Sequence, residues 1–266
     1  MNCNDYYDQH NEDKRFELDV FKLEYYRTLD IIERFIPERK CVIYDIAGGT
    51  GHYFRYLIEQ GHNVTMCDLS PRHVEIARNR YPEKKNRIFT GDARNLPELE
   101  SNSADVVLNL GAMYHLPDPE DRLDANNESW RLLKPGGMLF NSYCIRNATA
   151  YVEGIQDDMY ADPGFLLMFK AIRKKGTAPF DKIMQYFYFH TLDEIKKDLK
   201  ASNFNGYFKI IGIESIGGAV KSFAEKLDNE AEKEKLFNFI RICEEDEALM
   251  GFNSHVMGIS VKKIKS

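Results

Sequence analysis

The sequence contains a single tryptophan, five cysteines and no long run of apolar residues. No stretch approaches the roughly 20 apolar residues that a transmembrane helix needs, so we expect no membrane partner. The cysteines are scattered, odd in number and without C-x-x-C spacing, which argues against a disulfide framework. They predict reduced core thiols in a cytoplasmic protein. Trp130 is expected in the core.

The sequence also has no excess of positive charge. It contains 36 Lys and Arg residues and 42 Asp and Glu residues, which gives a net charge of −6. Nucleic-acid binding draws on clustered basic residues, so we expect no nucleic-acid partner. The seven histidines lie apart without H-x-x-x-H spacing, and the sequence predicts no metal site. The length of 266 residues suffices for one large α/β domain with an added subdomain.

The stretch from Cys41 to Tyr53, CVIYDIAGGTGHY, joins a strand pattern to a cluster of glycines. Apolar and β-branched residues lead into Gly48, Gly49 and Gly51, and a helix-compatible segment follows. Glycines in such a turn can adopt positive φ and let backbone N–H groups approach a ligand. The sequence therefore predicts a nucleotide-cofactor turn between a buried parallel strand and a helix.

Two kinds of cofactor compete for this turn. A dinucleotide site needs G-x-G-x-x-G, and Phe54 occupies the position of its third glycine. Asp45, at the end of the strand, would repel a pyrophosphate but would attract a cationic ligand. These residues favour a cationic cofactor over a dinucleotide.

The segment 45–51, DIAGGTG, resembles motif I of the class I S-adenosylmethionine (SAM) methyltransferases, [DE]-x-G-x-G-x-G, with alanine in place of the first glycine. In that family the turn passes under the methionine part of SAM, and the acidic residue helps to hold its ammonium group, directly or through water. The resemblance implies SAM as the cofactor and assigns to its binding Asp45, Ala47, Gly48, Gly49 and Gly51.

A second predicted strand, 63–68, ends in Asp68, close to the spacing of about 20 residues at which nucleotide folds place a ribose-binding carboxylate. Ser70 and Pro71 then supply an N-cap and a first helical residue. We assign Asp68 and its neighbour Leu69 to cofactor binding.

A third predicted strand, 87–90, runs into the tripeptide Gly91, Asp92 and Ala93. The methyltransferase family has a similar segment in the loop that meets the edge of the adenine. The resemblance therefore assigns Asp92 and Ala93 to the adenine.

The near-continuous apolar run 104–110 predicts a central parallel strand, and Leu110 at its end is assigned to the cofactor. By resemblance, Tyr114 and His115 just beyond it face the methyl group and are the candidate catalytic residues. His115 has three open interpretations, as a general base, as a group that orients the acceptor, or as a structural histidine. The segment 109–112, NLGA, lacks the [DN]-P-P-[FYW] pattern of enzymes that methylate exocyclic amines of nucleic acids.

Four segments are predicted along the chain: an N-terminal helical cap (1–40), a SAM-binding α/β core (41–146), an inserted lid (147–190) and a C-terminal completion of the sheet (191–266). The segment 147–190 is rich in aromatics and methionines, as expected of a lid over an acceptor pocket, or of a helical hairpin that only covers the sheet. In the cap, Tyr25, Tyr26 and Arg27 either close the cofactor site or pack as ordinary core residues.

The sequence thus predicts a doubly wound α/β fold with a seven-stranded, mostly parallel sheet, N-terminal helices and a helical lid. The predicted last strand, 255–261, fits the antiparallel strand of the class I methyltransferases. The predicted function is transfer of a methyl group from SAM to an oxygen, nitrogen or sulfur atom of a small molecule. Two alternatives stay open: an NAD(P)-dependent oxidoreductase and a SAM-binding regulatory module without turnover.

Overall fold

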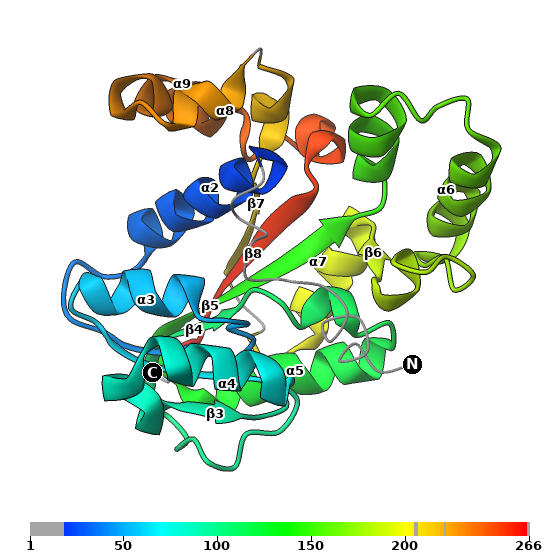
Figure 1. The fold of residues 1–266 in the computed structure, drawn as a ribbon. Helices are drawn as coiled ribbons and strands as arrows, with labels where there is room; N and C mark the ends of the chain where they lie inside the picture. The colour runs from blue at the N-terminus through cyan, green and yellow to red at the C-terminus, as the bar shows by residue number, and fades with distance from the viewer. Residues whose placement is uncertain (1–18, 205–206, 221, 265–266) are drawn as a thin grey trace.

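The structure is a computed structural model that describes residues 19–204, 207–220 and 222–264. The first 18 residues of the predicted cap lie outside the described residues. A twisted sheet runs through the centre of the molecule, with helices on both faces (Figure 1). No helix among the described residues is long and apolar enough to cross a membrane.

The sheet has eight strands, of which seven follow the order β3-β2-β1-β4-β5-β8-β7 and a short eighth strand pairs with β5. In that order the strands are β3 (Ile88–Thr90), β2 (Asn63–Asp68), β1 (Val42–Asp45), β4 (Ala104–Asn109), β5 (Leu133–Ile145), β8 (His255–Val261) and β7 (Phe208–Gly212). The first five are mutually parallel, and β8 is antiparallel to both of its neighbours. The predicted mostly parallel sheet and its antiparallel last strand are confirmed.

The additional strand β6 (Phe189–His190) corrects the predicted strand number. It pairs in parallel with the end of β5, through Cys144 and Ile145. A two-residue strand has no alternating pattern to read, so the sequence carried no signal for it.

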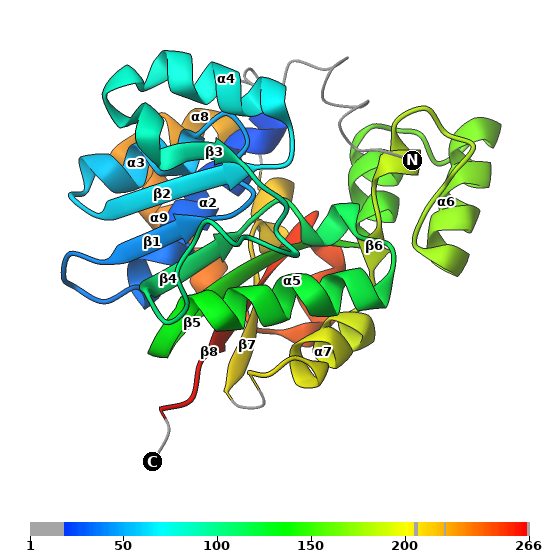
Figure 2. The ribbon, with the colours of Figure 1, turned by 90° about the horizontal axis from the view of Figure 1, so that it is seen from below.

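Helices α2 (Asp19–Phe35), α3 (His52–Glu59) and α4 (Pro71–Arg80) cover one face of the sheet, where they share a core with β1, β2 and β4. Helices α5 (Pro119–Leu132) and α7 (Leu192–Ala201) cover the other face (Figure 2). The predicted helices on both sides of the sheet are therefore confirmed. Trp130, expected in the core, is only half-buried at its margin, where the Lys262 ammonium lies 3.9 Å from the ring centre.

Local signals in the sequence set several helix ends. The Ser70 hydroxyl accepts a hydrogen bond from the His73 N–H at the start of α4, as predicted. At the start of α7, Thr191 and Glu194 form the capping box that the sequence predicts. Gly61 adopts a φ of +85° just past α3, which is the left-handed conformation that ends many helices.

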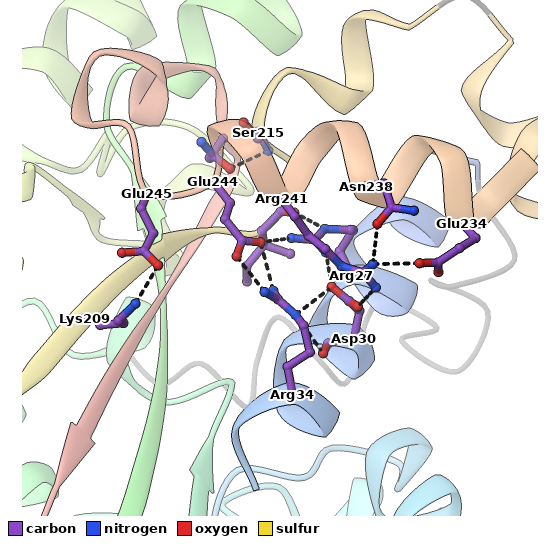
Figure 3. Close-up of polar contacts among 12 residues, drawn as sticks. Arg27, Asp30, Arg34, Lys209, Ser215, Glu234, Asn238, Arg241, Glu244 and Glu245 are labelled. Atoms are coloured by element: carbon purple, nitrogen blue, oxygen red, sulfur yellow. Dashed lines mark hydrogen bonds and ion pairs between the residues drawn. The ribbon is translucent and has the colours of Figure 1, made fainter.

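A buried ionic network fastens α2 to α9 (Glu230–Cys243) and to the end of β7 (Figure 3). Arg27 is fully buried and donates hydrogen bonds to Asp30, to Glu244 at 2.5 Å and to the Ile213 carbonyl at 3.1 Å. Arg34 adds two hydrogen bonds to Glu244, at 2.7 and 2.8 Å. The network fixes the position of α2 relative to the end of the sheet at which β7 and β8 lie.

The segment 147–190 forms a lobe that stands away from the sheet in both views (Figures 1 and 2). It contains a π-helical segment (Ala150–Gln156), α6 (Pro163–Lys175) and a short 3-10 turn (Met184–Tyr186) before β6. The lobe has a small core of its own, formed by Phe165, Met168, Ile172 and Ala178. The segment boundaries at 40, 146 and 190 stay a prediction.

Candidate functional site

A cavity of about 1030 Å³, which includes its part open to solvent, lies at the carboxyl ends of the parallel strands. This is the edge at which open α/β sheets bind their ligands. The predicted site residues on its wall are Ala47, Gly48, Gly49, Asp68, Leu69, Asp92, Ala93, Leu110, Tyr114 and His115. The structure thus brings together residues that follow four different strands.

The glycine turn supplies the floor of this cavity. Gly49 has a φ of +56°, and a Cβ atom built on it would meet nothing within 4 Å, so open space lies above the turn. The Gly49 N–H donates a hydrogen bond of 2.8 Å to Asp68 Oδ2, which ties the turn to the end of β2. Gly51, with a φ of +90°, faces the Tyr81 ring and does not line the cavity. In this structure Gly51 allows the backbone of the turn to adopt a positive φ. Its expected contact with the cofactor stays a prediction.

Asp45 lies beneath the glycine turn. Its carboxylate is fully buried, does not line the cavity, and lies so close under the turn that a Cβ atom on Gly48 would be 2.9 Å from Oδ2. Burial, together with the nearby charge of Asp68, raises the pKa of Asp45 to about 7. The expected contribution of Asp45 to the ammonium group of the cofactor, directly or through water, stays a prediction.

Asp68 lies on the cavity wall, and both of its oxygens are oriented by neighbours. Oδ2 accepts from the Gly49 N–H, while Oδ1 accepts from the Ser70 N–H at 2.9 Å and faces His73 Nδ1 at 3.2 Å. These contacts hold the carboxylate in one orientation at the end of β2. A carboxylate has about four lone-pair sites, two on each oxygen, so Oδ2 keeps one site that can accept a hydroxyl.

Asp92 is held by Arg94, which donates to both of its oxygens, at 2.6 Å from Nη2 and at 3.0 and 3.1 Å from Nε. A further Arg94 nitrogen donates to Asp121 at 2.7 Å. Burial raises the pKa of Asp92, but the hydrogen bonds from Arg94 outweigh burial and lower it overall. Leu69 and Ala93 line the same wall as Asp92. This end of the cavity is therefore partly apolar and carries a fixed carboxylate.

Tyr114 and His115 lie on a 3-10 turn that follows β4, at the other end of the cavity. The Tyr114 hydroxyl donates to the Leu110 carbonyl at 3.1 Å, and its ring stacks on Phe187 with centres 6.1 Å apart. His115 Nδ1 lies 2.7 Å from the Tyr186 carbonyl, and since a carbonyl only accepts, Nδ1 carries the proton. In the neutral ring Nε2 is then the acceptor nitrogen.

The lobe 147–190 reaches the site only through its last residues. Tyr186 accepts from His115, Phe187 stacks on Tyr114, and the Tyr188 N–H donates to the Tyr114 carbonyl at 2.7 Å. None of the described residues of 147–190 lines the cavity itself. The segment thus supports the candidate catalytic residues from behind, and its role as a lid stays a prediction.

The three cap residues chosen from the sequence pack as ordinary structural residues. Arg27 is fully buried in its ionic network, and Tyr25 stacks on Tyr53 with ring centres 5.5 Å apart. Neither Tyr25 nor Tyr26 lines the cavity. Their neighbour Glu24, which the sequence analysis passed over, is the residue of α2 that lines it.

Several other wall residues were missed. His52 and Tyr53 follow the glycine turn, and His73 follows the Ser70 cap, so their places in the sequence could have indicated them. Glu24 had no such signal, because a single glutamate in an amphipathic helix does not reveal which residues fold against it.

Phe54 separates the two cofactor hypotheses. Its side chain is fully buried and packs with Tyr81, the ring centres lying 5.6 Å apart. A dinucleotide fingerprint needs a glycine at this position so that the helix packs closely on the strand. The buried ring therefore argues against a dinucleotide site.

Comparison with known families agrees with this geometry. Residues 44–141 match the family model described as a methyltransferase domain. The predicted resemblance to class I SAM-dependent methyltransferases is thereby confirmed, and with it SAM as the cofactor of the family.

Curated relatives match the same part of the chain. The 2-methyl-6-phytyl-1,4-hydroquinone methyltransferase of Spinacia oleracea is 35% identical over 104 residues, which is 38% of this chain and 29% of the relative. The probable tRNA methyltransferase 9B of Mus musculus is 34% identical over 110 residues, or 41% of this chain and 23% of the relative. The chain therefore spans less than a third of the length of these relatives.

Solved structures are similar over nearly the whole chain. A SAM-dependent methyltransferase of Thermotoga maritima, described as a possible histamine N-methyltransferase, has a TM-score of 0.59 and 19% identity and covers 98% of each chain. A SAM-dependent methyltransferase of Methanosarcina mazei has a TM-score of 0.56 at 19% identity, covering 88% of this chain and 98% of the other. At this identity the similarity concerns the fold.

The cavity wall suits a cationic sulfonium cofactor. Open space lies above Gly49, where a backbone turn without a Cβ atom admits close approach. Three carboxylates line the cavity, those of Glu24, Asp68 and Asp92, whereas Arg94 is the only lysine or arginine among the described wall residues. By the Coulomb argument an acidic wall of this kind attracts a cation and repels a pyrophosphate.

Proposed function

We propose that this protein is a SAM-dependent methyltransferase that transfers the methyl group to an oxygen, nitrogen or sulfur atom of a small molecule. The observation that carries the proposal is the single cavity wall shared by the glycine turn, the carboxylates of Asp68 and Asp92, and the pair Tyr114 and His115. Residues suited to a cofactor lie at one end of this wall, and residues suited to an acceptor lie at the other.

In this proposal Asp68 binds the ribose hydroxyls, and Asp92, with the apolar residues Leu69 and Ala93, borders the adenine. The backbone of 47–49 supports the methionine part. When bound, SAM supplies an electrophilic methyl group. The protein then contributes mainly by alignment of donor and acceptor, which is worth up to roughly 7 to 11 kcal/mol in favourable cases.

His115 is the proposed group for removing a proton from the acceptor. The Tyr186 carbonyl fixes the proton on Nδ1, so a neutral ring presents Nε2 as the acceptor nitrogen, the form that a general base requires. Tyr114 is proposed to shape the adjoining wall, since its hydroxyl already donates to the Leu110 carbonyl.

Two measurements test this function. Isothermal titration should give saturable binding of S-adenosylhomocysteine, the product form of the cofactor, and no binding of NADH under the same conditions. Incubation with SAM and a panel of phenols, thiols and amines should then yield S-adenosylhomocysteine with at least one acceptor. Tight NADH binding without S-adenosylhomocysteine binding would favour the oxidoreductase alternative, and binding without turnover would favour the regulatory module.

The relatives point to different acceptors, since one is named for a hydroquinone and another for tRNA. We favour a small molecule because the described cavity wall is acidic and offers Arg94 alone as a cation, whereas nucleic-acid binding draws on many. Methylation of added tRNA, with no activity on the small-molecule panel, would reverse this choice.

A further inference from the structure

Large apolar side chains are exposed mainly on one part of the lobe, residues 155–183. Among the described residues thirteen such side chains are exposed, and seven of them lie in this segment. The seven are Ile155, Met159, Tyr160, Leu166, Leu167, Phe180 and Ile183. Single apolar residues scattered over a surface are ordinary, whereas a concentration of them in one region indicates an interaction site.

Helix α6 has one buried and one exposed side. Its buried side chains belong to the small core of the lobe. The exposed positions between them are Leu166, Leu167, Lys170, Arg173 and Lys174. Leu167, Lys170 and Lys174 follow one another at three- and four-residue spacing, so they form one stripe along the helix on the side away from that core. The exposed side of α6 therefore combines leucines with basic residues.

The end of the lobe that contains α6 is basic, although the protein is acidic. Residues 163–183 contain five Lys and Arg residues and one Asp, a net charge of +4. The remainder of the chain contains 31 basic and 41 acidic residues, a net charge of −10. The five basic residues, all exposed, are Lys170, Arg173, Lys174, Lys175 and Lys182. The one carboxylate, that of Asp181, accepts hydrogen bonds from the N–H groups of Ile183 and Met184, at 2.8 and 2.9 Å.

Exposed basic residues on another helix, α9, are neutralised by their neighbours. Lys233 pairs with Glu230 at 2.6 Å, and Lys235 pairs with Glu232 at 2.7 Å. The sequence contains no Asp or Glu from 163 to 180, so the basic residues of α6 have no such neighbours along the helix. We refer to the exposed side chains of 163–183 as the lobe surface. Its positive charge is not compensated locally.

The composition of the lobe surface favours one kind of partner. An anionic membrane offers phosphate groups to Lys and Arg side chains and an apolar boundary to aliphatic ones. Single-stranded nucleic acids also attract basic residues, but their bases stack on aromatic side chains, whereas Leu166, Leu167 and Ile183 are aliphatic. Basic and aliphatic side chains on one exposed helix therefore suit an anionic lipid surface better than a nucleic acid.

The acidic remainder of the chain does not prevent this contact. Helix α6 lies at the outer edge of the lobe, and the lobe stands away from the sheet in both views (Figures 1 and 2). Salt screens charges beyond a Debye length of about 8 Å at physiological ionic strength. Contact through α6 therefore keeps most of the acidic residues outside the range of strong repulsion.

We propose that the lobe surface binds the surface of an anionic lipid bilayer, with Leu166 and Leu167 in the apolar boundary and the basic side chains at the phosphate groups. A peripheral contact of this kind needs no spanning helix. It revises the expectation of no membrane partner, which was based on the lack of a long apolar run. The proposal does not depend on methyl transfer. Its connection to the site is that residues 186–188 of the same lobe contact Tyr114 and His115.

The test is flotation of the full chain with lipid vesicles. One set of vesicles is pure phosphatidylcholine, and the other contains about one quarter phosphatidylglycerol, which is anionic. Binding is measured at about 0.05 and 0.5 M salt, because high salt screens the charges. The wild type should bind the anionic vesicles at low salt, and at least about tenfold more weakly both at high salt and on pure phosphatidylcholine.

Two variants of the lobe surface test its residues. Lys170→Gln combined with Lys174→Gln should lower binding to the anionic vesicles about 25-fold, at roughly fivefold for each basic residue. The matched control is Lys197→Gln combined with Lys200→Gln, which removes two exposed charges from α7. The control should bind as the wild type does.

Leu167→Gln tests the apolar part and should lower binding to the anionic vesicles about tenfold, because one leucine leaves the apolar boundary. Its matched control is Ile242→Gln on α9, where the side chain is 81% exposed outside the lobe. This control should also bind as the wild type does. All these substitutions are at exposed positions, and circular dichroism verifies that each variant is folded.

Several results would overturn the proposal. Absence of wild-type binding to the anionic vesicles, equal binding to both kinds of vesicle, or equal losses in the variants and their controls would each do so. Sedimentation velocity without lipid tests a second copy, whose acidic remainder would also attract the lobe surface. A dimer that Leu167→Gln dissociates, without vesicle binding, would assign the lobe surface to that second copy. Binding of added tRNA that is lost in the double lysine variant, without vesicle binding, would assign it to nucleic acid.

Discussion

At the cofactor end of the cavity, several contacts join residues that are close in sequence, whereas at the acceptor end the contacts of His115 and His255 join distant segments. Asp68 meets Ser70, and Asp92 meets Arg94, each two positions apart. His115 meets Tyr186, 71 positions away. His255, whose ring centre lies 6.0 Å from that of Tyr114, meets Glu214, 41 positions away. The cofactor end is therefore a set of local turns on a shared sheet edge, and the acceptor end depends on how separate parts of the chain pack together.

This difference explains why the two ends can change independently. A turn after a strand keeps its geometry wherever the sheet forms. The residues assigned to the cofactor therefore do not depend on the segments that build the acceptor end. The acceptor end is assembled from α2, the last strands and the lobe 147–190, so changes in any of them alter the pocket. Function at this end is set by loops and insertions carried on a rigid scaffold.

The largest expected effect tests whether long-range contacts hold α2, and with it Glu24, in place. Arg27→Met removes a fully buried guanidinium and leaves the carboxylates of Asp30 and Glu244 without that partner. We expect the free energy of unfolding to fall by about 3 to 5 kcal/mol, as for other broken buried ion pairs. Urea unfolding followed by circular dichroism measures it.

The matched control is Arg55→Met, which removes the exposed Arg55–Glu59 pair on α3. Exposed pairs contribute about 0 to 1 kcal/mol, so this variant should unfold almost as the wild type does. Similar losses in both variants would contradict the role assigned to the α2 network.

The next prediction concerns the cofactor end alone. Asp68→Ala removes the carboxylate that holds the Gly49 and Ser70 N–H groups and that we assign to the ribose. The dissociation constant of S-adenosylhomocysteine should rise up to about 100-fold, since a hydrogen bond to a charged group, worth about 1.5 to 3 kcal/mol, is lost. Isothermal titration measures the change. The control Asp124→Ala, at an exposed position on α5, should bind S-adenosylhomocysteine as the wild type does. If Asp68→Ala leaves the dissociation constant unchanged, the cofactor assignment loses its basis.

His115→Ala tests the acceptor end without disturbing the cofactor end. If His115 is the general base, kcat should fall roughly 100-fold for an acceptor that must lose a proton, and the affinity for S-adenosylhomocysteine should stay the same. A rise in KM alone would indicate a residue that orients the acceptor, and a lower melting temperature with normal kinetics would indicate a structural histidine. The pH profile of kcat is decisive, because only a general base contributes its own ionisation to it.

The smallest expected effect concerns the carboxylate under the glycine turn. The pKa of Asp45 is raised from 3.8 to about 7 in the folded protein, so the folded state keeps this proton to higher pH than the unfolded state. The free energy of unfolding should therefore decrease as the pH rises from about 4 to about 7. Asp45→Asn should remove this dependence. The difference in the free energy of unfolding between Asp45→Asn and the wild type should therefore shift in favour of the variant from pH 5 to pH 8, on the order of 2 kcal/mol.

Thermal melts of Asp45→Asn and wild type at pH 5 and pH 8 give the comparison. Glu38→Gln, an exposed position after α2, serves as the control for loss of one carboxylate. If the difference in stability between the wild type and Asp45→Asn is the same at pH 5 and at pH 8, Asp45 ionises normally.

The cofactor end was largely predictable from the sequence for a simple reason. Strand pattern, glycine turn and terminal carboxylate occur in order, and parallel strands bring their carboxyl ends to one edge. Gly49, Asp68, Asp92 and Leu110 therefore reach the cavity as expected. The burial of Asp45 was not foreseen, because the pattern shows that an acidic residue ends the strand but not whether the following turn covers it.

The acceptor end was predicted less well. Tyr114 and His115 were found because they directly follow β4, but their partners Tyr186 and Phe187 were not. Glu24 was overlooked in favour of Tyr25, Tyr26 and Arg27, which pack elsewhere. Which face of α2 meets the cavity depends on the distant residues that pack against it, and helical periodicity does not reveal those.

The sequence by itself determined the alternation of strands and helices, the glycine turn and the carboxylates after β2 and β3, because each depends on neighbours within a few residues. Only the tertiary structure decided that Asp45 lies beneath the turn and that Glu24, Glu214 and His255 meet at one place. The physical reason is that burial and charge pairing arise when segments far apart in the chain pack together, and no local pattern specifies which segments these are.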